Sequence, residues 1–371
     1  MIRAIQAGQP TDDLDGLGLI DCDVHVGRED KWLEDLMPYW SRSERAILTG
    51  STTAAQGVQG GTGRKLPRSP YYAAGANNST GPGADDAAEF AVDLLDRNGI
   101  DRAIVLSRAG LSLGVYPQAW EAVLIARAAN NWITDRWLGR DHRWRGLITV
   151  APQSVEWSIK EIERCAKSPN MVGIYLPLTS DPMGAERLFP IFAAAVASEF
   201  PVVIHSSAAH TYANGPRLMT AINWLDYRYS GGMPVQLNIA TMVTSGAFET
   251  FPDLKVLCAD AGFAWLGPTM WTLDDMWKAS RSSAPWVKRP PSDYIHKQCW
   301  VTTQPWISAP NDEQLAHALE MSRADTTLVF GSDYPHSPHS EYLTAIQQIP
   351  VQYQRAVRAQ NALALFGKRL M

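Results

Sequence analysis

Leu19-Ile20-Asp21-Cys22-Asp23-Val24-His25-Val26 is the stretch that decides the fold. Its apolar start is typical of a buried strand, and Asp21, Asp23 and His25 fall at every second position. Because the side chains of a strand alternate between its faces, we expect these three on one face, with Asp23 and His25 nearest the C-terminal end. A carboxylate and an imidazole one strand step apart suit a divalent metal of the zinc, manganese or iron(II) type. The alternative is a strand end whose carboxylates cap the next element.

The composition excludes several classes of protein. The 371 residues are 46% hydrophobic with a net charge of −5 and no basic run, which argues against a nucleic-acid-binding surface. Residues 1–18 have no apolar segment behind a basic start, and no apolar run reaches the roughly 18 residues that span a bilayer. Without any Cys-x-x-Cys spacing, Cys22 and Cys258 are expected to be reduced core thiols. We therefore expect a cytoplasmic protein with a small-molecule substrate and no membrane partner; a homodimer is one expected oligomeric state.

From residue 85 onward, apolar strand patterns alternate with helical patterns. The expected later strands are 103–107, 146–150, 172–176, 201–205, 254–260, 300–303 and 327–333, and the main expected helices are 85–98, 118–138, 154–166, 185–198, 263–279 and 353–366. Eight strands separated by helices predict parallel pairing through right-handed crossovers and a (β/α)8 TIM barrel. The competing doubly wound sheet usually carries a glycine-rich turn after its first strand, and none follows here.

Residues 28–84 interrupt this alternation with Trp- and Pro-containing pieces followed by low-complexity runs. Such a stretch is too long for a plain connection in a compact domain. We interpret it as a lid-like insertion after the first strand, within a single domain that spans residues 1–371. A disordered linker is the alternative, weakened because the first strand is too short to be a domain alone.

Polar residues close several of the expected strands. His205 ends the fifth strand, Asp260 the sixth and Asp333 the eighth, in addition to Asp23 and His25 on the first. In a barrel these strand ends converge on one mouth. Carboxylates gathered there repel each other unless they take up protons or share a cation. The positions of these residues thus favour a metal centre over separate caps.

Several of these motifs together resemble the amidohydrolase-related family, the group of aminocarboxymuconate-semialdehyde decarboxylase-like hydrolases and decarboxylases. The resemblance rests on Leu19 to His25, Pro201-Val202-Val203-Ile204-His205, Phe251-Pro252-Asp253-Leu254-Lys255-Val256, Phe330-Gly331-Ser332-Asp333-Tyr334-Pro335-His336 and Asn361-Ala362. It extends from Leu19 to Phe366 apart from the insertion. The Ser-Asp-Tyr-Pro-His run combined with an Asp-x-His first strand is its most specific part.

The resemblance implies a TIM-barrel enzyme with one divalent metal, Zn²⁺ or alternatively Mn²⁺. Its ligands would be Asp23, His25, His205 and Asp333, with Asp333 also the general base and acid. The family's decarboxylases carry a His on the sixth strand that contacts the metal-bound water, and this chain has Asp260 there. No Lys follows the fourth strand, so no carbamylated lysine is expected, which argues against the binuclear members of the superfamily.

The expected reaction depends on Asp260. A divalent metal lowers the pKa of its bound water toward about 7. Three carboxylates on one ion would repel a substrate carboxylate, so we expect hydrolysis of an amide, ester or lactone of a small aromatic or cyclic substrate. The alternatives are a metal-dependent decarboxylase of an aromatic or unsaturated acid, and a non-catalytic metal- or ligand-binding barrel.

Four further residues are weaker candidates. His336 could bond Asp333 or the substrate and act in catalysis, or it could pack a loop. Arg28, Trp265 and His210 are candidates for contacts with the substrate; a solvated arginine, a core tryptophan and a histidine away from the mouth are the competing interpretations.

Overall fold

The computed structural model describes residues 17–27, 31–50, 86–206, 224–336 and 339–371. Within them, eight parallel strands form one sheet in the order β1 to β8. They are β1 Ile20–Val26, β2 Arg102–Ser107, β3 Trp144–Thr149, β4 Met171–Tyr175, β5 Val202–His205, β6 Val256–Ala259, β7 Cys299–Thr302 and β8 Leu328–Val329. Backbone hydrogen bonds from Cys22 N to Phe330 O (2.9 Å) and from His25 N to Tyr334 O (2.8 Å) join the two edges. The predicted (β/α)8 barrel is confirmed.

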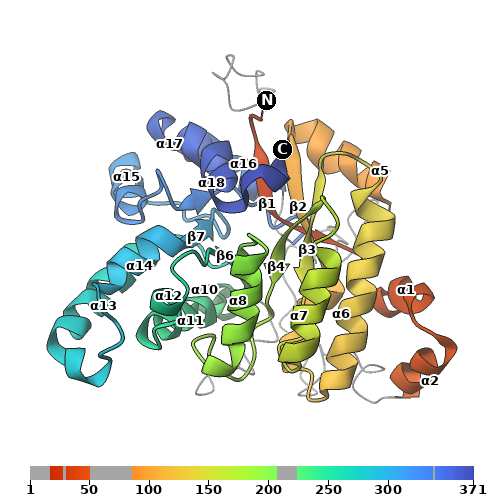
Figure 1. The fold of residues 1–371 in the computed structure, drawn as a ribbon. Coiled ribbons are helices and arrows are strands. Elements are labelled where there is room, and N and C mark those ends of the chain that lie inside the picture. Colours follow the sequence, from red (N-terminus) through yellow and green to blue (C-terminus); the bar gives the residue numbers. More distant parts are fainter. Residues whose placement is uncertain (1–16, 28–30, 51–85, 207–223, 337–338) are drawn as a thin grey trace.

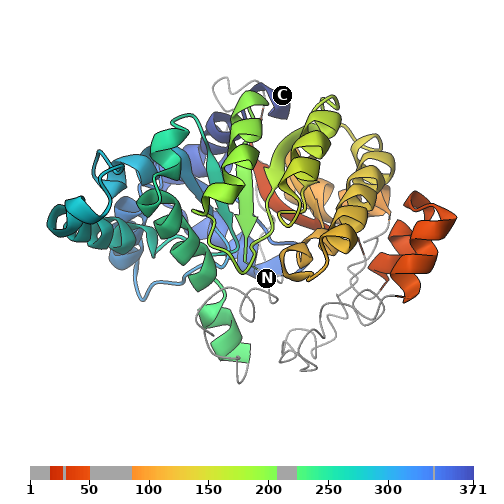
Figure 2. The same ribbon diagram turned by 60° about the horizontal axis from the view of Figure 1, so that its bottom comes forward.

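Helices surround the sheet on its outside (Figures 1 and 2). The longer ones are α2 Arg42–Gly50, α6 Ala119–Ile133, α7 Val155–Cys165, α8 Phe189–Ala197, α11 Met233–Thr244, α13 Leu266–Ser280, α14 Pro291–Gln298, α15 Asp312–Met321 and α16 His339–Gln348. The shorter ones are α1 Trp32–Leu36, α5 Ala87–Phe90, α10 Trp224–Ser230, α12 Ala247–Thr250, α17 Val351–Arg355 and α18 Asn361–Phe366. The helix expected over 118–138 begins as α6 and continues as a π-helical segment, Thr134–Leu138.

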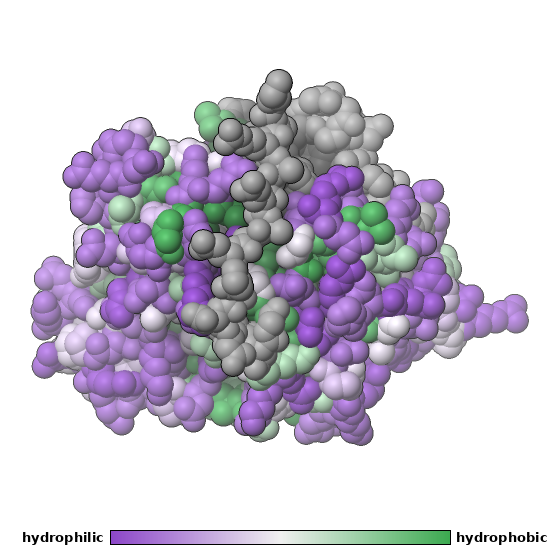
Figure 3. Space-filling model, turned by 90° about the horizontal axis from the view of Figure 1, so that it is seen from above, coloured by the Kyte–Doolittle hydropathy of each residue, from purple (hydrophilic) through white to green (hydrophobic). Residues whose placement is uncertain are grey.

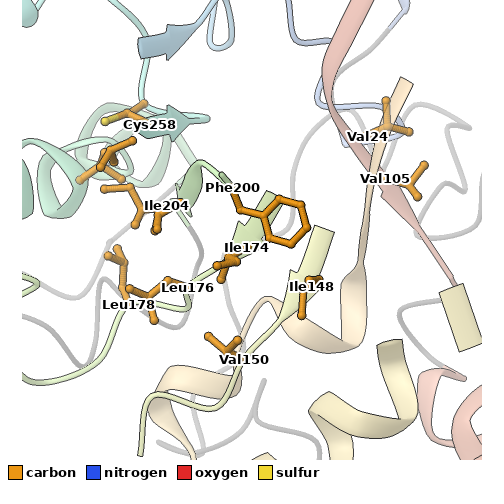
Figure 4. Packing of buried hydrophobic residues seen from close by; sticks show 14 of the residues in the cluster. Val24, Val105, Ile148, Val150, Ile174, Leu176, Leu178, Phe200, Ile204 and Cys258 are labelled. Carbon is orange, nitrogen blue, oxygen red and sulfur yellow. The ribbon is translucent and has the colours of Figure 1, made fainter. Parts of the chain in front are cut away.

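The strands separate two apolar cores. Outward-facing residues such as Val24, Val105 and Ile148 pack toward the helices, as Figure 4 shows for part of this cluster. The inner core contains residues of the strands, among them Ile104 and Leu257, together with residues of the C-terminal segment such as Phe366. Arg102 and Arg145, at the starts of β2 and β3, donate to backbone carbonyls of residues 369–371. The C-terminal segment therefore packs at the end of the barrel where the strands begin, and the opposite end is left for polar side chains.

The insertion after β1 is described only for residues 31–50. Trp40 Nε1 donates to Leu124 O at 2.9 Å, and Glu44 forms an ion pair with Arg127 at 2.7 Å, so this part packs against the outside of α6. Residues 28–30 and 51–84 lie outside the described residues. The single-domain assignment and the lid role of the insertion stay predictions.

The described residues also show the character of one molecular face, the lengths of the apolar helices and the state of the thiols. Figure 3 views the molecule from the top of Figure 1, and hydrophilic residues cover most of the described surface there. None of the helices in the described ranges is both long and apolar enough to cross a bilayer. All four cysteines are buried and free, as expected for Cys22 and Cys258.

Candidate metal centre

An irregularity in β1 decides which of its polar side chains reach the mouth of the barrel. The register with β2 shifts between Asp21 and Val24. Asp21 pairs with Ala103 of the outer core, whereas His25 pairs with Leu106 of the inner core. Because a bulge adds one residue, it reverses the alternation of side chains beyond it. The prediction that Asp21 shares a face with His25 is therefore wrong.

The other strand-end residues do converge. Asp23, His25, His205 and Asp333 are all buried, and one ligand atom from each lies within 4.8 Å of the others. The Nε2 atoms of His25 and His205 are 3.0 Å apart. His25 Nε2 lies 3.3 Å from Asp23 Oδ1 and 3.2 Å from Asp333 Oδ1. His205 Nε2 lies 3.4 Å from Asp23 Oδ1. Three strands, or their extensions, thus aim four donor atoms at one point.

This donor set fits a divalent cation. Ligands about 2.1 Å from one ion lie about 3.0 Å apart in octahedral geometry and about 3.4 Å apart in tetrahedral geometry. The four separations given above, 3.0 to 3.4 Å, cover the same interval, and the remaining pairs of donor atoms lie within 4.8 Å. Two carboxylates and two imidazoles also form a set that binds zinc or manganese. The four predicted ligands are thus brought together in an arrangement that a single divalent ion would satisfy.

Neighbouring groups orient His205. Its Nδ1 contacts the carbonyl oxygen of Ser206, which makes Nδ1–H the donor and directs Nε2 toward the other three residues. Ser206 Oγ in turn lies 2.6 Å from both the carbonyl oxygen and Oδ2 of Asp260. Asp260 does not belong to the group of mutually close donors. It bonds to Ser206 beside His205, and its charge is one of those that raise the pKa of His205. A catalytic role for Asp260 stays a prediction.

His336 supports Asp333 from the other side. Its Nδ1 lies 3.0 Å from Asp333 Oδ1, and its ring centroid is 4.5 Å from that of His25. Burial, followed by the charges of Arg108 and His25, lowers the pKa of His336 to about 3. His336 is therefore neutral near pH 7 and donates Nδ1–H to the carboxylate. The bond predicted between these two residues is present; a catalytic role for His336 stays a prediction.

In the metal-free protein, burial and neighbouring charges shift the pKa values of the two imidazoles upward and that of Asp23 downward. Burial acts to raise the pKa of Asp23, but His205 and His25 outweigh it and hold the pKa below its usual value. Burial acts to lower the pKa of His205, but the carboxylates around it, Asp23 first, raise it to about 10. The pKa of His25 is also raised, since its bonds to Asp23 and Asp333 outweigh burial. The carboxylates are thus ionised, and a cation would take the place of protons on the imidazoles.

Two backbone features shape the strand ends. Asp260 and Asp333 have positive φ values of 48° and 52°, a left-handed conformation that Asp adopts more readily than most residues. Gly331 lies between two elements of the site: a Cβ there would be 3.0 Å from Asp23 Cβ and 3.1 Å from Thr302 Cβ. The glycine of the Phe-Gly-Ser-Asp run is thus required by close packing beside a ligand.

Of the three residues predicted to contact the substrate, the structure describes only Trp265. Trp265 is partly buried, its indole nitrogen donates to Gly262 O at 2.8 Å, and it packs against the outer core. Its described contacts are with that core and with the loop after β6. Arg28 and His210 lie outside the described residues. The predicted substrate contacts of all three stay predictions.

Two neighbours of the centre were missed from the sequence. Arg108 follows β2 directly, is buried, and exerts its charge on His336. Ser206 follows the ligand His205 and bonds Asp260. Their positions immediately after strands were the available signal, and a search limited to metal-ligating residue types passes over both.

Comparisons with known proteins find relatives along most of the chain. A family model described as Amidohydrolase (Amidohydro_2) matches residues 20–368. The chain is 24% identical over 261 residues to gamma-resorcylate decarboxylase of Polaromonas sp. (strain JS666), covering 67% of this chain and 77% of that protein. It is 27% identical over 247 residues to 2-amino-3-carboxymuconate-6-semialdehyde decarboxylase of Dictyostelium discoideum, covering 65% and 64%.

Solved structures share the fold. A 5-carboxyvanillate decarboxylase of Novosphingobium aromaticivorans, complexed with manganese and a nitrobenzoic acid, superposes with a TM-score of 0.70 at 21% identity, covering 95% of this chain and 97% of that one. A dihydroxybenzoic acid decarboxylase of Polaromonas sp. JS666, with manganese and 2-nitroresorcinol, has a TM-score of 0.65 at 19% identity, covering 94% and 97%. At these identities the likeness establishes the fold alone.

Proposed function

The chain belongs to the amidohydrolase family, and from that premise we propose that it is a metal-dependent, non-oxidative decarboxylase of an aromatic acid. The observation that carries the proposal is the donor set Asp23, His25, His205 and Asp333. Two carboxylates and two neutral imidazoles balance the charge of one divalent ion. A substrate carboxylate can therefore approach the centre without facing a net negative charge.

This proposal differs from the hydrolysis favoured by sequence, and Asp260 is the reason. The sequence argument counted Asp260 as a third negative charge on the ion. Asp260 lies outside the group of mutually close donors and shares a hydrogen bond with Ser206. Asp260 is thus not one of the donors, although its charge still acts on His205. The buried cation of Arg108 near His336 adds attraction for a substrate carboxylate. The decarboxylases among the relatives support the same choice.

We propose Mn²⁺ as the ion, with Zn²⁺ as the competing choice. Carboxylate-rich sites suit manganese, and two of the similar structures hold it. When bound, the ion would supply positive charge for the carboxylate and a neighbouring oxygen of the substrate.

We assign the proton transfer to Asp333. Burial would raise the pKa of Asp333, but the imidazoles of His336 and His25 hold it well below its usual value, so its carboxylate is ionised at rest. With an ortho-hydroxy aromatic acid, Asp333 takes the phenolic proton and returns it to the ring carbon. The bond from that carbon to the carboxylate breaks, carbon dioxide leaves, and the product is the phenolate. No outside proton is needed, and His336 keeps Asp333 oriented through Nδ1–H.

The test compares reaction classes on one enzyme. Manganese-loaded and zinc-loaded protein are assayed on ortho-hydroxybenzoic acids, aromatic amides and lactones, with carbon dioxide release and hydrolysis products both measured. We expect one carbon dioxide per acid consumed, lost on Asp333→Asn, and no amide or lactone cleavage. Cleavage of an amide or lactone without carbon dioxide release from any acid would restore the hydrolase interpretation.

A further inference from the structure

Asp21 is a buried carboxyl that the proposed reaction does not use. The bulge in β1 turns it away from the four donors, and its side chain is fully buried. Asp21 Oδ1 accepts a hydrogen bond from Ser332 N at 2.9 Å and another from Asp23 N at 3.2 Å. Asp23 is itself a ligand, and Ser332 directly precedes the ligand Asp333. One carboxylate oxygen therefore binds the peptide groups beside both carboxylate ligands.

Asp21 acts where the segment after β8 meets β1 and the sheet closes. β8 has regular geometry over Leu328–Val329 only, and the chain beyond it reaches β1 through single bonds such as Asp333 N to Asp23 O at 3.0 Å. Asp21 adds a side-chain contact to the few backbone hydrogen bonds that set the register of these two segments. Metal ligands need that register, because groups that hold the ligands tune metal affinity.

We propose that Asp21 is a positioning residue of the metal centre, which sets the distance between Asp23 and Asp333 by binding the backbone N–H groups of Asp23 and Ser332. The proposal rests on the metal centre of the proposed function and is independent of which reaction occurs there. It makes the first polar residue of the opening motif a part of the site without making it a ligand.

Asp101, which directly precedes β2, provides a matched control beside the start of β1. Its Oδ2 accepts hydrogen bonds from Gly18 N at 2.6 Å and Leu19 N at 2.9 Å. Asp101 and Asp21 thus make the same kind of contact, a carboxylate oxygen accepting two backbone N–H groups. Asp101 holds the two residues just before β1, whereas Asp21 holds Asp23 and Ser332. Loss of Asp101 removes comparable backbone support at the end away from the metal ligands.

The experiment measures metal binding to the full-length wild type, Asp21→Ala, Asp21→Asn and Asp101→Ala. Calorimetric titration with Mn²⁺ gives the affinity, the visible absorption of the Co²⁺-loaded chain reports ligand geometry, and thermal melts of the metal-free proteins report stability. We expect Asp21→Ala to weaken Mn²⁺ binding by about 10- to 100-fold, as for other groups that hold metal ligands, and to alter the Co²⁺ spectrum. Asp21→Asn, which keeps a carbonyl acceptor, should stay near the wild type.

The outcomes distinguish a failure of the positioning role of Asp21 from a failure of the proposed metal centre. Asp101→Ala should melt at a lower temperature yet bind Mn²⁺ like the wild type; if Asp21→Ala behaves the same way, the positioning role is wrong. Should Asp21→Ala not fold, Asp21→Thr, whose branched side chain suits a strand, replaces it with the same criterion. Failure of the wild type to bind Mn²⁺, Zn²⁺ or Co²⁺ would remove the metal centre itself.

Discussion

Metal binding by this chain should release protons and strengthen steeply with pH. In the metal-free protein the pKa of His205 is raised to about 10, because the surrounding carboxylates, Asp23 first, outweigh the opposing effect of burial. A metal binds only the neutral imidazole. Since this pKa lies above the ordinary value, the protonated form dominates at neutral pH, and the ion must displace that proton. Affinity should therefore rise with pH until the pKa of His205 is reached, and level off above it.

The size of the effect follows from the distance between the working pH and that pKa. At pH 7.5 the proton on His205 should weaken metal binding about 300-fold relative to the high-pH limit, or by about 3 kcal/mol. Each pH unit between 7 and 9 should raise the affinity about tenfold for each proton released. His25, whose pKa is also raised, adds to the proton count wherever it is protonated.

Calorimetric titration with Mn²⁺ in two buffers of different ionisation enthalpy measures the number of protons released. We expect about one or two protons per metal at pH 7.5. His142, whose side chain is 83% exposed, provides the control: His142→Ala should leave the count unchanged. An affinity that is flat between pH 7 and 9, with no proton released, would refute the reasoning.

Three further predictions concern stability and rate. The raised pKa of His205 stabilises the metal-free fold fully below its ordinary pKa of 6.5, and this contribution is lost as pH rises toward 10; thermal melts should fall over that interval without metal and much less with it. Asp333→Asn should cut the turnover number by about 100-fold or more, measured as carbon dioxide release, while circular dichroism stays native because Asn tolerates a positive φ. Gly331→Ala should destabilise the fold by about 1–3 kcal/mol in denaturant titrations, because its Cβ would crowd Asp23 and Thr302, and should weaken Mn²⁺ binding.

The sequence by itself determined the barrel and the four converging donors. Alternating apolar strands and helical patterns predict parallel pairing, and in a parallel barrel every strand ends at the same mouth. Placing polar residues at strand ends was therefore enough to select Asp260 and the four residues that the structure brings together; the family resemblance then separated Asp260 from those four, which are Asp23, His25, His205 and Asp333. This works because, in a parallel barrel, a residue at the C-terminal end of any strand lies at the same mouth.

The tertiary structure alone decided the surroundings of those donors. The bulge in β1 puts Asp21 and His25 on opposite faces of the strand. The alternation of residue types along the sequence gives no sign of this bulge. Whether Asp260 meets the ion or Ser206 depends on distances of a few ångströms between β5 and β6, as does the effect of Arg108 on His336. Spacing along a strand fixes which end a side chain occupies; the hydrogen-bond partner and the charge it meets there are set by neighbouring strands far away in the sequence.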